Sequence, residues 1–201
     1  MKTIGLLGGM SWESTTTYYK EINRRVRQVQ CGLHSARCVV FSFDFAEIEE
    51  LQLDHNTSNQ LQSIECFFAN YDAAAKLRLA GAEAVVFCTN TMHFVSHGIE
   101  RASQLPLIHI VDPTAEHVLK ERCYSGYIDF SKRAMTHLSI TAAGFKSVGL
   151  LGTGFTMEKD FYRSRLADKF GLRVIVPDEE GRATVHSIIY TELANGIISE
   201  T

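Results

Sequence analysis

The chain has 201 residues, of which 45% are hydrophobic and 21% charged, and it carries a formal net charge of −3. This is the composition of a globular protein of one or two domains, and the small net charge gives no sign of a nucleic-acid or anionic membrane partner. No apolar stretch approaches the roughly 20 residues that a membrane span requires, and the opening residues lack the form of a signal peptide. We therefore expect a cytoplasmic protein.

Short apolar runs in the first half of the chain predict four strands, at Thr3–Leu7, Cys38–Phe43, Ala84–Phe87 and Leu107–Val111. Apolar residues at helical spacing lie between them. They are Tyr18, Ile22, Val26 and Val29 in one predicted helix, and Leu61, Ile64, Phe68, Tyr71 and Ala75 in the next. Strands that alternate with helices predict a mostly parallel sheet, and continuously apolar strands predict that helices cover both of its faces.

The opening of the chain recurs once. Ile4–Gly8 matches Val148–Gly152, and Tyr18 falls on Tyr162 at the same offset. A further predicted strand, Leu172–Val176, follows the second copy. Self-similarity of this kind indicates two structural units built on the same plan.

The repeat predicts how the chain is organised. We expect an α/β fold of two related Rossmann-like domains with parallel sheets, the second of them incomplete. The predicted boundaries are 1–115 for the first domain, 116–144 for a linker and 145–201 for the second domain. A polar stretch at 118–140 fits neither copy, so we interpret it as an insertion on the linker.

The sharpest chemical feature is Cys88-Thr89-Asn90-Thr91, which directly follows a predicted strand. In open α/β sheets, ligands bind at the carboxyl ends of the strands. Thr89 or Asn90 can cap the next helix, and a helix N-terminus favours a thiolate and also binds carboxylates. The motif predicts either a reactive cysteine in a carboxylate site or a buried structural cysteine beside an ordinary helix cap.

The other cysteines and histidines form no familiar disulfide or metal pattern. Cysteines at 31, 38, 66, 88 and 123 make an odd number, and no Cys-x-x-Cys occurs. This argues against a disulfide framework. His93 and His97 have the i, i+4 spacing of helical zinc ligands, but no glutamate follows His93. We interpret them as two histidines on a polar helix face.

Two glycine turns are candidate ligand sites. Gly8-Gly9-Met10-Ser11 lets a ligand approach the backbone and, with Thr15, offers hydroxyl groups. It lacks the Gly-Lys-Ser/Thr of a phosphate-binding loop. Gly149-x-x-Gly152-x-Gly154 does not have the dinucleotide-binding spacing, although Asp178 after the next strand could imitate a ribose-binding acid. Nucleotide binding is therefore the least favoured interpretation.

Basic and polar residues near the predicted strand ends are weaker candidates. Arg163 and Arg165 lie on the helix after the second glycine turn. An arginine there could bind a side-chain carboxylate of a substrate through two hydrogen bonds, or it could lie on a solvated helix face. Asp44 and Gln52 follow the second predicted strand, near the same sheet edge.

Three sequence elements together resemble the aspartate/glutamate racemase family. They are Gly8-Gly9-Met10-Ser11-Trp12-Glu13-Ser14-Thr15, Cys88-Thr89-Asn90-Thr91-Met92-His93, and Leu150-Leu151-Gly152-Thr153 with Thr156-Met157-Glu158-Lys159-Asp160-Phe161-Tyr162. The resemblance covers nearly the whole chain apart from 118–140. It implies a two-domain enzyme in which one cysteine from each domain faces the α-carbon of the substrate. One thiolate removes the α-proton, and the opposite thiol supplies a proton to the other face.

For this chain, the resemblance implies racemisation of aspartate or glutamate without pyridoxal phosphate or metal, with Cys88 as a proton-transfer residue. The positions implied to bind substrate are Met10, Ser11, Gln52, Thr89, Asn90 and Thr91, with Arg163 or Arg165 as a poorer match for the side-chain carboxylate. We also expect a homodimer, because a short second domain would leave an open sheet edge and an uncovered apolar face.

One family element does not occur in these 201 residues. The second motif of the family is Gly-Cys-Thr-Glu, and the repeat places the equivalent of Cys88 near position ~230. Cys123 is no obvious substitute, because no strand precedes it and no threonine follows it. Two functions therefore remain open. The chain is either a racemase or a homologue that binds an amino-acid carboxylate without racemising it.

Overall fold

The computed structural model describes residues 1–52, 64, 67–68, 72–120 and 146–199. The chain divides into two compact units, Met1–His109 and Ile110–Thr201, which we call unit 1 and unit 2. Each has a parallel sheet with helices packed against it, so the predicted α/β class with parallel sheets is confirmed. Within the described residues, no helix is both long enough and apolar enough to cross a membrane.

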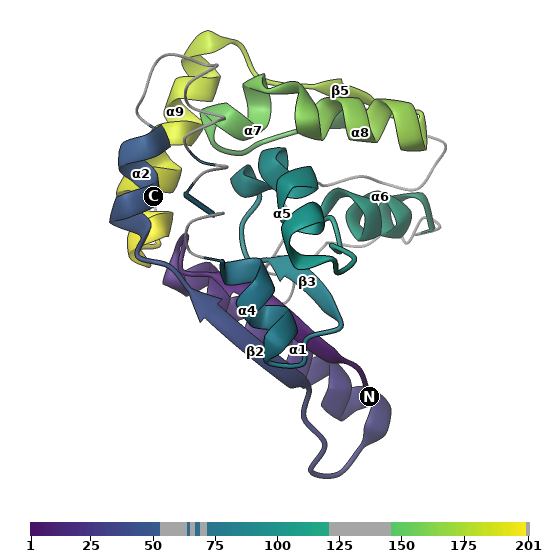
Figure 1. Cartoon of the computed structure of the whole chain (residues 1–201). Helices are drawn as coiled ribbons and strands as arrows, with labels where there is room; N and C mark the ends of the chain where they lie inside the picture. The colour runs from purple at the N-terminus through teal and green to yellow at the C-terminus, as the bar shows by residue number, and fades with distance from the viewer. Residues whose placement is uncertain (53–63, 65–66, 69–71, 121–145, 200–201) are drawn as a thin grey trace. The chain divides into compact units, whose positions relative to one another are not determined.

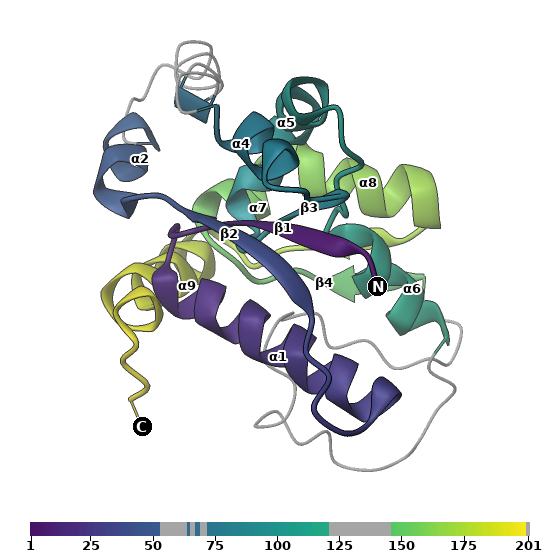
Figure 2. The same cartoon turned by 60° about the horizontal axis from the view of Figure 1, so that its bottom comes forward.

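Unit 1 is built on a parallel sheet with the strand order β2-β1-β3 (Figures 1 and 2). The strands are β1 (Thr3–Gly8), β2 (Arg37–Ser42) and β3 (Ala84–Phe87). β1 pairs with both neighbours, so that Ile4 lies opposite Cys38 on one side and Ala84 on the other. The sequence predicted these three strands to within one residue at each end.

The fourth predicted strand, Leu107–Val111, is largely a misassignment. Leu107 forms one isolated parallel bridge with Val85. Val85 N–H donates to Pro106 O at 2.9 Å, and Ile108 N–H donates to Val85 O at 2.8 Å. Val111 instead begins helix α6 (Val111–Lys120). Pro113 fits this helix start, because a proline is tolerated in the first turn of a helix.

Helices cover both faces of the unit 1 sheet (Figures 1 and 2). α1 (Trp12–Gln30) lies on one face and α4 (Ala73–Leu79) on the other. A Cβ atom at Gly8 would meet Thr15 of α1, whereas one at Gly5 would meet Leu77 of α4. Strand residues an odd number apart point to opposite faces, so the glycines allow close packing on each side.

The remaining described elements of unit 1 are α2 (Phe45–Gln52), the 3-10 helix η1 (Thr91–Val95) and α5 (Ser96–Ser103). The core includes Leu7, Met10, Phe43, Ile48, Ile64, Phe68, Leu77, Val85, Phe87, Met92 and Ile99. Of the apolar stripe predicted for a second helix, Ile64 and Phe68 are helical and buried, and Ala75 lies in α4. Leu61 and Tyr71 lie outside the described residues.

Unit 2 contains a sheet of two parallel strands, β4 (Ser147–Gly149) and β5 (Arg173–Ile175). The other elements are α6, α7 (Gly154–Glu158), α8 (Asp160–Phe170), α9 (Glu179–Thr191) and the 3-10 helix η3 (Leu193–Asn195). β5 lies within the predicted strand Leu172–Val176. Tyr162 in α8 is buried, as its counterpart Tyr18 is in α1, so the repeat places equivalent side chains in equivalent positions.

The chain passes from unit 1 to unit 2 between His109 and Ile110, and α6 runs continuously through residues 115 and 116. Residues 121–145 lie outside the described residues. The insertion at 118–140, and the boundaries of the predicted linker, therefore remain predictions.

Candidate active site

Cys88 lies at the carboxyl end of the unit 1 sheet, one residue past β3. Its backbone N–H donates to Leu7 O at 2.9 Å, which continues the pairing of β1 with β3 beyond the last strand residue. On the other side of β1, Phe43 N–H donates to Gly8 O at 3.0 Å. Three segments, the glycine turn, the end of β2 and the Cys88 motif, therefore meet at one sheet edge, where α/β folds bind ligands.

The glycine turn is tightly built. Gly9 has a φ of +88°, and a Cβ atom there would collide with the backbone of Phe43. Thr15 Oγ1 accepts a hydrogen bond from Gly9 N–H at 2.9 Å and donates one to Ser11 O at 3.1 Å. Ser11 Oγ accepts from Ser14 N–H at 3.5 Å and caps α1. The hydroxyls that the sequence offered to a ligand therefore also hold this turn together, and the Met10 side chain is part of the core.

The Cys88 thiol is fully buried, with 0% of the residue exposed. Burial, and to a smaller extent the nearby thiol of Cys38, raises its pKa to about 12. This corrects the expectation that the site would favour a thiolate. The element that follows Cys88 is a five-residue 3-10 helix, and Asn90 at its N-cap makes no side-chain capping bond. Loss of hydration therefore outweighs any stabilisation of the anion by a helix end.

The residues after Cys88 turn away from the sheet and enter η1. Thr89 and Asn90 are half-buried, and Thr91 is buried as the first residue of η1. Asn90 O accepts a hydrogen bond from His93 N–H at 3.2 Å and lies 3.2 Å from His93 Nδ1. The motif is thus a short turn, joined to β1 at Cys88 and closed by His93 at its other end.

His93 and His109 are buried beside this turn; the sequence analysis placed His93 on a polar helix face and did not single out His109. His93 is 1% exposed and His109 is 5% exposed. The His93 ring lies 5.3 Å from the Phe87 ring and 4.5 Å from the His109 ring, centroid to centroid. The interpretation of a polar helix face holds only for His97, whose side chain is 85% exposed. It fails for His93 because η1 ends at Val95 and α5 begins at Ser96, so the two histidines do not share one helix.

A signal for His109 existed in the sequence. It lies inside the fourth predicted strand, and the parallel bridge between Val85 and Leu107 places it opposite Phe87, two residues further along both segments. Any polar residue at the end of that run would reach the same sheet edge as Cys88. Within the described part of the chain, no three or more His, Cys, Asp or Glu side chains gather into a candidate metal site.

Both candidate arginines bind carboxylates within unit 2. Arg165 Nε and Nη2 donate to Asp112 Oδ1 and Oδ2 at 2.6 and 2.8 Å. Arg163 Nη2 donates to Asp160 Oδ1 at 2.8 Å and to Glu158 O at 3.2 Å. The Arg165 guanidinium thus already holds a carboxylate in the two-bond geometry that the sequence assigned to a substrate.

Two polar candidates lie at the helix that follows β2. Gln52 is the last residue of α2, and its side chain lies outside the described residues. Asp44 lies just before α2. Its Oδ1 accepts a hydrogen bond from the backbone N–H of Ala46, the second residue of that helix, at 3.1 Å. Asp44 therefore supports the first turn of that helix.

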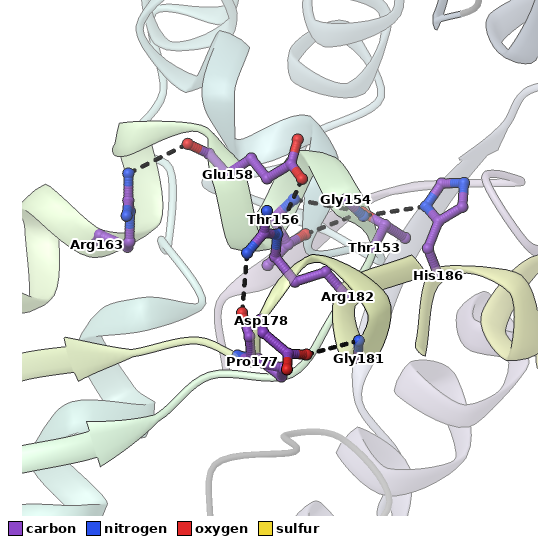
Figure 3. A network of polar contacts seen from close by, with 10 residues as sticks. All are labelled: Thr153, Gly154, Thr156, Glu158, Arg163, Pro177, Asp178, Gly181, Arg182 and His186. Atoms are coloured by element: carbon purple, nitrogen blue, oxygen red, sulfur yellow. Dashed lines mark hydrogen bonds and ion pairs between the residues drawn. The ribbon is translucent and has the colours of Figure 1, made fainter. Parts of the chain in front are cut away.

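The second glycine turn is held by hydroxyl and imidazole groups (Figure 3). Thr153 caps α7 by accepting from Thr156 N–H at 3.4 Å. Gly154 N–H donates to His186 Nδ1, on α9, at 3.0 Å. A Cβ atom at Gly152 would press against Thr156, as one at Gly8 would press against Thr15. The two units therefore use the same device, a glycine at the strand end with a threonine of the next helix packed on it.

Asp178, which the sequence offered as a ribose-binding acid, caps α9. Its Oδ1 accepts from Gly181 N–H at 2.9 Å. Beside it, Arg182 Nη1 donates to Pro177 O at 2.9 Å and Nε donates to Glu158 Oε1 at 3.1 Å (Figure 3). These contacts give Asp178 a structural role as the N-cap of α9.

Comparisons with known proteins agree with this arrangement. Residues 7–127 match the model of the Asp/Glu/hydantoin racemase family. A Yersinia pestis protein proposed to be an Asp/Glu racemase is 45% identical, with a TM-score of 0.76 over 100% of this chain and 75% of that one. An aspartate racemase homologue from Pyrococcus horikoshii OT3 is 30% identical, with a TM-score of 0.66 over 98% of this chain and 74% of the other.

A more distant structure shows the same fold. The aspartate racemase of Picrophilus torridus is 19% identical, with a TM-score of 0.61 over 95% of this chain and 69% of that one. The family match includes the glycine turn and the Cys88 motif, which meet at one sheet edge in unit 1. The chain therefore belongs to the Asp/Glu/hydantoin racemase family.

Proposed function

We propose that this protein is an amino-acid racemase that acts on aspartate or glutamate without pyridoxal phosphate or a metal ion. Membership of the family supports the reaction class. The observation that carries the proposal is the position of Cys88, at the carboxyl end of β3 and hydrogen-bonded to Leu7, next to the glycine turn. Of the two relatives at 30% identity or more, one is proposed to be an Asp/Glu racemase and the other is an aspartate racemase homologue. This supports the choice of aspartate or glutamate as substrate.

The proposed substrate contacts lie on the segments that meet at this edge. Thr89, Asn90 and Thr91 would bind the α-carboxylate, and groups of Met10, Ser11 and Gln52 would line the rest of the site. A fixed carboxylate gives the reaction its acidity, because negative charge that develops at the α-carbon is shared with a carboxylate already held by hydrogen-bond donors. The contacts of Arg163 and Arg165 favour structural roles for both.

Cys88 can take part in the proton transfer in both directions, as a base and as an acid. As a thiolate, its sulfur takes the α-proton and leaves a carbanion. As a thiol, its sulfur gives a proton to the carbanion and becomes a thiolate. With a pKa of about 12, ionising the thiol at pH 7 costs about 7 kcal/mol. The α-ammonium group of a bound substrate would reduce this cost, because a positive charge within about 4–6 Å stabilises a thiolate.

A second function has specific support. The full burial and raised pKa of Cys88 favour a homologue that binds an amino-acid carboxylate without racemising it, because a thiol that stays protonated cannot remove the α-proton. The two functions make different predictions for the α-proton.

The deciding experiment follows the α-proton by proton NMR in deuterium oxide, with L- and D-aspartate and glutamate. Cys88 lies on one face of a bound substrate. Acting alone, it should exchange the α-proton of one enantiomer with retention of configuration, faster than it racemises either. The variant Cys88→Ala should lose this exchange, and the control Cys31→Ala, at an exposed position, should keep it.

Calorimetry with the same four amino acids separates the outcomes. Binding without any exchange would favour the non-racemising homologue. Absence of heat at millimolar ligand, with a folded protein, would reject both functions. Exchange that persists in Cys88→Ala would show that another residue moves the proton.

We also propose that the protein is a homodimer. Four of the exposed large apolar residues lie within the last described residues of the chain, at Ile188, Leu193, Ile197 and Ile198. Burial of such side chains between two copies is favourable because it removes apolar surface from water. Sedimentation velocity over a hundredfold range of concentration tests this, and a single monomeric species throughout would contradict it.

A further inference from the structure

The position of His93 is fixed by the backbone that follows Cys88. Asn90 O accepts from the His93 backbone N–H, and the same oxygen lies 3.2 Å from His93 Nδ1. A carbonyl oxygen can only accept, so the contact requires a proton on Nδ1. In its neutral form, the ring is therefore the Nδ1–H tautomer.

Two other rings set the orientation of the imidazole. Phe87, the last residue of β3, packs edge-on against it with an interplanar angle of 64°. The ring of His109, in the segment that forms a bridge with β3, packs against the His93 ring with an interplanar angle of 60°. Since His93 is 1% exposed and His109 is 5% exposed, the ring has little room to rotate away from Asn90.

The turn from Cys88 to Asn90 needs such support, because few contacts with the described residues hold it. Its first residue is fixed by the bond from Cys88 N–H to Leu7 O. Asn90, at the far end, makes no capping bond with its side chain. The two hydrogen bonds from His93 to the Asn90 carbonyl are what close that end of the turn.

We propose that His93 is a positioning residue for the turn Cys88–Asn90, and that His109 keeps the His93 ring in the plane that reaches Asn90. The consequence for substrate rests on the proposed function, in which this turn binds the α-carboxylate. A displacement of about 1 Å at such a site can lower the rate by about 10²-fold. His93 acts through the turn, and the reacting atoms are those of Cys88 and the substrate.

Two substitutions separate the hydrogen bond from the packing of the ring. His93→Asn keeps a nitrogen donor at the same distance along the side chain and loses the ring. His93→Phe keeps a ring of similar shape and loses the donor. His97→Gln is the matched control, because His97 lies four residues away and its side chain is exposed.

Amide hydrogen exchange tests the proposal without any ligand. In His93→Phe, the amides of Cys88 and His93, which donate to Leu7 O and Asn90 O, should exchange about five- to tenfold faster than in the wild-type protein, which corresponds to the loss of one hydrogen bond. In His93→Asn and His97→Gln they should stay within about twofold of the wild type. The reverse order, with fast exchange only in His93→Asn, would show that ring packing alone matters and would overturn the proposal. A third variant, His109→Ala, should raise the exchange rate of the same amides. An unchanged rate would show that His109 does not hold the His93 ring in place.

Two further measurements complete the test. A ¹⁵N–¹H correlation spectrum should show the neutral His93 ring protonated at Nδ1, and protonation at Nε2 would overturn the proposal. For substrate, His93→Phe should weaken aspartate or glutamate binding and slow α-proton exchange, with His93→Asn restoring both. If the wild-type protein neither binds nor exchanges these amino acids, the proposed function fails, while amide exchange and the tautomer still decide the role of His93.

Discussion

Arg165 binds both carboxylate oxygens of Asp112, with hydrogen bonds of 2.6 and 2.8 Å. Lys169 adds a third bond, from Nζ to Asp112 Oδ2, at 2.6 Å. These contacts join α8 to α6 within unit 2. The hydrogen bond from Arg165 is the main cause that lowers the pKa of Asp112 to about 2, despite the partial burial of the carboxylate. The packing of α6 therefore relies on a charged Asp112.

Replacement of Asp112 should destabilise unit 2 in a pH-dependent way. We expect Asp112→Asn to lower the free energy of unfolding by about 1 kcal/mol at pH 7, a modest value because Lys169 and part of the pair are open to solvent. The pKa of Asp112 is lower in the folded state than in the unfolded state. The stabilisation is therefore present above about pH 4 and is lost as the pH falls towards about 2.

Urea unfolding at pH 7, 4 and 2.5 measures this difference. Asp160→Asn is the control, since Asp160 also pairs with an arginine but is 81% exposed. It should change the stability by less than about 0.5 kcal/mol. A loss of equal size in both variants, or a difference that is as large at pH 2.5 as at pH 7, would count against the role of Asp112.

The three described cysteines should react with an alkylating reagent in the order Cys31, Cys38, Cys88. Cys31 is exposed, whereas burial raises the pKa of Cys38 and raises that of Cys88 to about 12. At pH 8 a thiol with a pKa of about 12 has about 10³-fold less thiolate than one at 9.0. Timed labelling with mass-spectrometric mapping checks the order, and labelling in urea shows that each site can react. Labelling of Cys88 before Cys31 in the native protein would show that the Cys88 site opens in solution.

The placement of Cys88 could be predicted because it depends on local sequence. A buried apolar run that ends in a polar motif defines a strand end, and parallel strands bring their ends to one edge. The protonation state of the thiol could not be predicted in the same way. It depends on how completely the surrounding elements exclude water, and on whether the next segment is an α-helix or a short 3-10 turn.

The partners of His93 and Arg165 also lay beyond sequence reasoning. Each makes its decisive contact with a residue brought close by the fold. His93 meets His109 across two neighbouring segments, and Arg165 meets Asp112 across two helices. Spacing along one helix suggested zinc ligands or a solvated face instead. Such pairings follow from the register between elements, which single-residue patterns do not specify.

Gly9→Ala should be far more destabilising than Gly81→Ala, although both glycines have φ near +90°. A side chain in this conformation costs about 1 kcal/mol or more at either position. At Gly9, the added Cβ would also collide with the backbone of Phe43, whereas at Gly81 nothing lies within 4 Å. We expect a loss of about 3 kcal/mol or more for Gly9→Ala. Urea unfolding of both variants tests this, and similar losses would mean that the turn can move away from β2.

The last prediction concerns the hydroxyl of Thr15, which the glycine turn requires. Thr15 Oγ1 accepts from the buried Gly9 N–H at 2.9 Å. In Thr15→Val the side chain keeps its shape but offers no acceptor, so Gly9 N–H would lose its partner inside the protein. An unsatisfied buried donor costs about 1–3 kcal/mol, and we expect a loss of that size in the free energy of unfolding.

Thr17→Val, on the same helix, is the matched control. Thr17 Oγ1 only donates to Glu13 O. Its removal therefore leaves no buried donor without an acceptor and should change the stability by less than about 0.5 kcal/mol. Urea unfolding gives both losses, and amide exchange at Gly9 shows whether the effect is local. If Thr15→Val is no less stable than Thr17→Val and Gly9 stays protected, the turn does not depend on this hydroxyl. Thr15 would then be available to a ligand at the sheet edge beside Cys88.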